Sequence, residues 1–168
     1  MRNDVDRITR KNINAYRKNE SEKMKQQAAG YKDRVNPDYA KAPAVAGNEE
    51  NVLGMLLLYP EHKKKVFDEH LLTSNDFFTD LNRRIFEHIK SEYESNGSES
   101  VDINLAFSPE EVGRIAKMKI SRMALSDNGP EVLLECIEAL KKSMAQKSAT
   151  SAQTYDALDK LINLMIKN

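Results

Sequence analysis

The sequence predicts an all-α protein, a helical bundle followed by a C-terminal antiparallel helical hairpin. Charged residues make up 31% of the chain and aromatic residues only 7%, with no Trp, which favours helices with a heavily solvated surface. A hydrophobic content of 40% is consistent with a folded core. The third observation is the segment 52–59, which is nearly continuously apolar and rich in Leu and Met rather than β-branched residues.

Residues 52–59 are expected to form the central helix. Six of these eight residues are aliphatic or Met, so a helix there is apolar almost all round and belongs in the middle of a core. Glu49 and Glu50 suit a helix N-terminus, and Pro60 ends the segment. A buried parallel strand is the alternative, because periodicity does not separate the two for a short apolar run.

Four segments are expected along the 168 residues. Residues 30–47 contain Pro37, Pro43 and several alanines, which is the composition of a linker. Ahead of them, residues 1–29 lack Pro and have few apolar positions, which predicts a basic helical tail belonging to a preceding catalytic core. The bundle is expected at 48–129 and the helical hairpin at 130–168.

Three further helices are expected inside the bundle. Residues 61–72 and 80–96 carry apolar residues at helical spacing, and the second of these segments runs to Gly97, a C-cap signal. Ser108, Pro109 and Glu111 form the pattern of a capping box ahead of a third helix. Leu56 and Phe86 lie at the centres of the two strongest apolar stripes and are expected in the core.

The hairpin is expected from two helices, 130–148 and 151–166, joined by the small polar turn 148–151. Each helix has one apolar stripe, and the two stripes are expected to bury each other. Leu164 points away from the second stripe and Ile166 lies at its edge, so both are candidates for contact with a partner. The full set of candidate partner-binding residues is Tyr155, Leu158, Leu161, Ile162, Leu164, Met165 and Ile166.

The zero net charge of the chain conceals an asymmetry between its two ends. Residues 1–41 hold eleven Lys or Arg against six Asp or Glu, and the remainder holds fifteen against twenty. A basic arm of this kind is consistent with weak nucleic-acid contact, and equally with a solvated tail. The arm residues that would carry such a contact are Arg7, Arg10, Lys11, Arg17 and Lys18.

Enzyme chemistry is not indicated anywhere in the sequence. His62, His70 and His88 are too far apart to form a local metal motif, and the single Cys136 excludes cysteine clusters. There is no phosphate-binding glycine loop or nucleophile elbow. We therefore expect no catalytic residue, cofactor or metal in this segment. No apolar run reaches the roughly 18 residues of a membrane span and no secretory segment follows Met1, so a cytoplasmic location is expected.

Several short motifs resemble one family. Residues 52–60, Asp76-Phe77-Phe78 and the segment 82–87 (Asn-Arg-Arg-Ile-Phe-Glu) are similar to the helical domain shared by two bacterial replication proteins. One is the C-terminal helicase-interaction domain of DnaG-type primase. The other is the N-terminal domain of the DnaB-type hexameric helicase. The resemblance covers residues 48–123 and concerns core packing rather than catalysis.

The order of the segments resembles that of primase, in which a basic tail, a linker, a bundle and a terminal hairpin follow the catalytic core. The resemblance thus implies a non-catalytic, helicase-binding module that recruits primase to the hexameric replicative helicase for primer synthesis at the replication fork. The full-length protein would be a DNA-directed RNA polymerase, with its catalytic segments encoded ahead of Met1. The hairpin would dock on the helicase N-terminal domain, and would either pack on the bundle or swap between chains in self-association.

Two alternative functions remain open. The chain resembles the helicase N-terminal domain as well, and an ATPase domain encoded downstream would support that reading. A nucleic-acid-binding regulator that uses the basic arm is the second alternative, and its binding would weaken steeply with salt.

Overall fold

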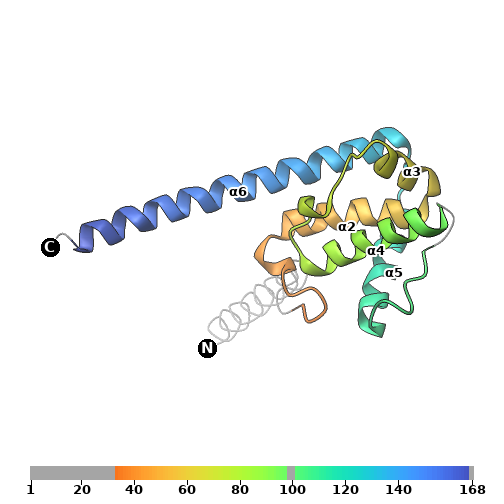
Figure 1. The fold of residues 1–168 in the computed structure, drawn as a ribbon, viewed down its shortest axis with the longest axis horizontal. Helices are drawn as coiled ribbons and strands as arrows, with labels where there is room; N and C mark the ends of the chain where they lie inside the picture. Colours follow the sequence, from red (N-terminus) through yellow and green to blue (C-terminus); the bar gives the residue numbers. More distant parts are fainter. Residues whose placement is uncertain (1–32, 98–100, 167–168) are drawn as a thin grey trace, which may run out of the picture.

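The described part of the chain folds into helices joined by loops, which confirms the predicted all-α class (Figure 1). The computed structural model describes the backbone of residues 33–97 and 101–166, and the side chains of 33–97 and 101–154. No strand occurs in these ranges. None of the helices within them is both long enough and apolar enough to cross a membrane. The elements in order are η1 (Tyr39–Lys41), α2 (Pro43–Leu58), α3 (Pro60–Asp68), η2 (Ser74–Asp76), α4 (Asp80–Asn96), α5 (Pro109–Met123) and α6 (Pro130–Ile166).

Helix α2 is the centre of the molecule, as its apolar sequence predicts. Helices α3, α4, α5 and α6 all pack against it, and Val52, Leu53, Met55 and Leu56 have no exposed surface. The helix begins at Pro43, which occupies its first turn, rather than near residue 48. The part of the expected linker that follows residue 42 is therefore helical, and the acidic pair at 49–50 lies within the helix instead of at its start.

Helices α2 and α5 approach each other closely at Gly54. A Cβ built on Gly54 would lie 2.7 Å from Cγ of Arg122 and 2.8 Å from the backbone oxygen of Met118. Backbone oxygen cannot move away as a flexible side chain can. Glycine at this position therefore sets the distance between the two helices.

Aromatic rings fill the space between α3, η2 and α4. The rings of Phe77 and Phe86 stack with their centroids 4.7 Å apart, and the ring centroids of Phe67 and Phe86 are 5.6 Å apart. Phe86 and Leu56 are both buried, which confirms their predicted place in the core. At the start of α5, Ser108 accepts from the backbone N–H of Glu111 and the Glu111 carboxylate accepts from Ser108, so the predicted capping box is confirmed.

The predicted C-terminal hairpin is wrong, because α6 is a single helix from Pro130 to Ile166. The hydroxyls of the expected turn bond back into the helix: Thr150 donates to the Gln146 carbonyl and Ser151 to the Lys147 carbonyl, each at 3.0 Å. The apolar stripe of residues 130–148, which was expected to pack against the second helix of the hairpin, instead packs on the bundle. Its central residues, Leu133, Ile137 and Leu140, are buried in the core, where α6 packs on α2.

Candidate protein-docking site

The two halves of helix α6 lie in different surroundings: the first packs on the bundle and the second extends beyond it. The candidate docking site is on the second half. Its first half packs along α2, where Asn48 donates to the Ala139 carbonyl and to the Ser143 hydroxyl, both at 3.2 Å. The Nζ of Lys147 lies 4.0 Å from the centre of the Phe78 ring. Beyond this point the helix continues away from the other helices (Figure 1).

The second half of α6 carries all of the candidate partner-binding residues. Tyr155, Leu158, Ile162 and Met165 are spaced by three or four residues, so the continuous helical backbone places them along one side. Leu161 and Ile166 adjoin this row at its two edges, whereas Leu164 belongs to another side. The side chains of all seven residues lie outside the described part, so the structure does not test their contacts.

The argument that singled out Leu164 as a partner contact no longer holds, because the predicted hairpin is wrong. That reason required a second helix to cover the row from Tyr155 to Met165 and leave Leu164 without a partner. Since α6 does not turn back on itself, the row now becomes the principal candidate.

An open groove lies where α6 leaves the bundle. Its volume is about 550 Å³, and it runs between residues 41–45 at the start of α2 and residues 143–154 of α6. Small side chains such as Ala42, Ala44 and Ser151 form much of its wall, and Lys147 stands beside them. The groove adjoins the projecting half of the helix and can accept a side chain from a docked protein.

The bundle wall beside α6 is fixed by a buried carboxylate, that of Glu49. This carboxylate accepts hydrogen bonds from the backbone N–H groups of Phe78 and Thr79, from the Thr79 hydroxyl at 2.7 Å and from the Asn82 amide at 2.8 Å. It therefore caps the N-terminus of α4 from a different helix. Burial raises the pKa of Glu49, and the four hydrogen bonds oppose that rise without cancelling it.

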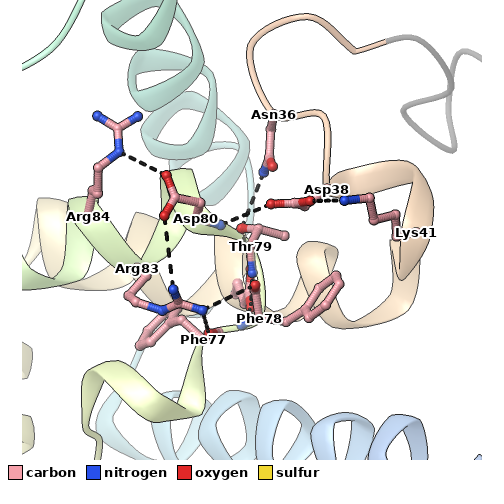
Figure 2. A network of polar contacts seen from close by, with 10 residues as sticks. Asn36, Asp38, Lys41, Phe77, Phe78, Thr79, Asp80, Arg83 and Arg84 are labelled. Carbon is pink, nitrogen blue, oxygen red and sulfur yellow. Dashed lines mark hydrogen bonds and ion pairs between the residues drawn. The ribbon is translucent and has the colours of Figure 1, made fainter. Parts of the chain in front are cut away.

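A second set of polar contacts joins the segment before α2 to the same helix end (Figure 2). Asn36 donates to the Thr79 hydroxyl at 3.4 Å, and Asp38 accepts from the backbone N–H of Asp80 at 3.3 Å. Arg83 donates to the backbone carbonyl of Phe77 at 3.1 Å. The expected linker is therefore part of the bundle from about residue 33 onward.

Arg114 of α5 also holds the segment before α2 against the bundle. Its guanidinium pairs with Asp33 at 3.0 Å and with Glu50 at 2.6 Å, and it lies over the ring of Tyr39. Burial raises the pKa of Glu50, while the charge of Arg114 lowers it. Sequence reasoning missed this cluster because its members are far apart in the chain and no local pattern joins them.

The described residues do not gather the groups that catalysis or metal binding would need. His62 contacts the Asn128 carbonyl at 2.7 Å and His88 the Asp102 carbonyl at 2.7 Å, so these two rings are held by backbone groups. Within ranges 33–97 and 101–154, no three His, Cys, Asp or Glu side chains converge as metal ligands. Cys136 is half-buried against the core, and this burial raises the pKa of its thiol. The basic arm before residue 33 lies outside the described residues.

The comparisons with known proteins relate the bundle to a replication protein. Residues 41–113 match the family model of the DnaB-like helicase N terminal domain. This range runs from the last residue of η1 to the start of α5, so it covers α2, α3 and α4 but neither most of α5 nor α6. No curated protein and no solved structure matches the chain. The bundle is thus similar to a helicase-related helical domain, and the match does not single out the primase C-terminal domain.

Proposed function

We propose that this chain is the helicase-binding module of a bacterial primase, which holds the primase at the replicative helicase. The family match supports a place among helicase-related domains. Segments 52–60 and 82–87 resemble the domain that primase and helicase share, so the choice of primase rests on the basic segment, residues 1–29, that precedes the bundle. The full-length protein would then be a DNA-directed RNA polymerase acting in primer synthesis.

The observation that carries the docking role is the division of α6. The apolar stripe of its first half is buried against α2. The helix then continues for about 19 residues beyond Lys147, or roughly 28 Å at 1.5 Å per residue. The row from Tyr155 to Met165 lies on this extension. A helix that presents an apolar row of this spacing suits a groove or another helix on a partner.

Recruitment of this kind needs no chemistry in the segment itself. Docking on the helicase raises the local concentration of the attached polymerase at the fork. A rigid bundle with a continuous helix also fixes the direction in which the docking row is presented.

A second candidate function is the N-terminal domain of the helicase itself, and the family match taken alone favours it. In that case the extension of α6 would pack on neighbouring copies in the helicase ring. The two candidates differ in what they do with an intact helicase hexamer. A primase module binds the assembled ring, whereas a helicase domain finds its position there already filled by the ring's own domain.

Isothermal titration calorimetry with the intact DnaB-type hexamer of the same organism tests the proposal. We expect the full chain to bind, Leu158→Asp to weaken binding by about ten- to a hundredfold, and Lys160→Asp to change it little. Lys160 is the matched control because it lies on the opposite side of the helix from the row. Absence of binding by the parent chain would overturn the primase assignment. Equal loss in both variants would remove the row as the docking surface.

A further inference from the structure

The outer side of α5 carries two exposed aliphatic residues between lysines. Ile120 is 64% exposed and Met123 is 66% exposed, and their spacing of three places them side by side on the helix. Lys117 precedes Ile120 by three residues and Lys119 precedes Met123 by four, so the lysines flank the apolar pair. Neither lysine forms an ion pair with a carboxylate of the described residues. We call these four residues the α5 patch.

The outer side of the first turns of α6 has the opposite charge. Leu134 is 44% exposed, and Glu131, Glu135 and Glu138 around it are all exposed. Within the ranges 33–97 and 101–154 these carboxylates have no cationic partner in ion-pair range. We call these four residues the α6 patch.

The two patches are not used within one chain. Helices α5 and α6 each pack mainly on α2 rather than on each other, and the loop 124–129 joins them. Helix α5 lies at the edge of the bundle, which leaves its outer side open (Figure 1). Among the described residues, each patch therefore has an apolar centre and charged groups outside ion-pair range of an opposite charge, which the other patch would complement.

We propose that the α5 patch of one copy of this chain packs against the α6 patch of a second copy. Each copy carries both patches near the same end of the molecule, so a two-fold arrangement brings both pairs together at once. Ile120 and Met123 would cover Leu134, and the lysines and glutamates would pair around this apolar centre. The surface is distinct from the extension of α6 and does not rest on the proposed function.

A protein partner fits these observations better than nucleic acid does. The α5 patch has two lysines with aliphatic residues between them, and no arginine or aromatic side chain on which a base could stack. The neighbouring α6 patch would repel a polyanion. A contact with so few apolar residues belongs with small interfaces, so the dimer is expected to be weak and concentration-dependent.

Charge reversal across the two patches tests the proposal. Sedimentation velocity of the full chain between roughly 10 µM and 1 mM is expected to show a reversible dimer, weakened by added salt. Lys117→Glu with Lys119→Glu makes the α5 patch acidic, and Glu135→Lys with Glu138→Lys makes the α6 patch basic. Each double variant alone is expected to weaken the dimer by about tenfold or more, because like charges then meet. Lys90→Glu on α4 is the control for a change of charge elsewhere, and circular dichroism checks the fold of every variant.

Mixing the two double variants gives the decisive result. In the mixed dimer every altered charge faces an opposite one, so the mixture is expected to dimerise at least as tightly as the parent. A parent chain that stays monomeric throughout the concentration range would overturn the proposal. So would folded double variants that dimerise like the parent, or a mixture that stays monomeric.

Discussion

The bundle and the projecting half of α6 differ in how their apolar residues are used. In the bundle, Leu133, Ile137 and Leu140 of α6 lie against α2, and the helix is one wall of a common core. Past Lys147, the same helix continues away from that core while its sequence keeps an apolar row at helical spacing. An amphipathic pattern therefore predicts a helix in both places. Which element, if any, buries the apolar side of that helix depends on the tertiary structure.

The largest expected effect comes from removing buried side chains of the bundle. Leu140→Ala and Phe86→Ala should each lower the free energy of unfolding by about 2 to 5 kcal/mol, because each leaves a cavity in a packed core. Leu134→Ala on the exposed side of α6 is the matched control and should cost less than about 1 kcal/mol. Urea unfolding measures all three, and equal losses for Leu140 and Leu134 would mean that the inner side of α6 is not part of the core.

A smaller effect is expected where α2 and α5 touch. Gly54→Ala should lower the free energy of unfolding by about 1 to 3 kcal/mol, since the added methyl group meets backbone oxygen. Gly113→Ala, in α5, meets nothing within 4 Å and should raise stability by roughly 0.5 to 1 kcal/mol through helix propensity. Thermal unfolding should therefore shift in opposite directions. A stabilised Gly54→Ala variant would contradict the close approach of the two helices.

The buried carboxylate of Glu49 predicts a pH effect confined to the bundle. Its pKa is raised in the folded protein, so the folded state binds its proton more tightly than the unfolded state does. The contribution of Glu49 to stability is then greatest below its ordinary pKa of about 4.5 and falls as pH rises through the raised value. The parent's advantage in free energy of unfolding over Glu49→Gln should accordingly shrink as pH rises from about 4 to 7. Urea unfolding of the two proteins across this pH range measures the difference, and an advantage that grows with pH would contradict the raised pKa.

Much of the fold could be predicted from the sequence because its signals are local. The apolar segment around Leu56, the stripe through Phe86 and the capping box at Ser108 each depend on neighbours within a few turns of helix. The contacts that fix the bundle wall join residues far apart in the sequence. Glu49 caps a helix that starts about 30 residues later, and Arg114 pairs with Asp33 near the start of the described chain. Propensity and spacing contain no information on such pairs.

The hairpin failed as a prediction for a related reason. Small polar residues at 148–151 are typical of a turn, but their hydroxyl groups can also bond to the preceding turn of a helix. Whether the chain turns there depends on what the apolar stripe of residues 133–140 packs against. That partner is α2, so the stripe is not available to a returning helix.

The central claim is that the bundle carries stability and the projecting half of α6 carries binding. Deleting residues 155–168 tests it directly, because the deletion removes the whole candidate row and keeps every residue identified here as core. Calorimetry against the N-terminal domain of the DnaB-type helicase should show binding by the full chain and none by the deletion, with the urea midpoint of the bundle nearly unchanged. Undiminished affinity of a stably folded deletion would place the docking surface on the bundle and contradict the account.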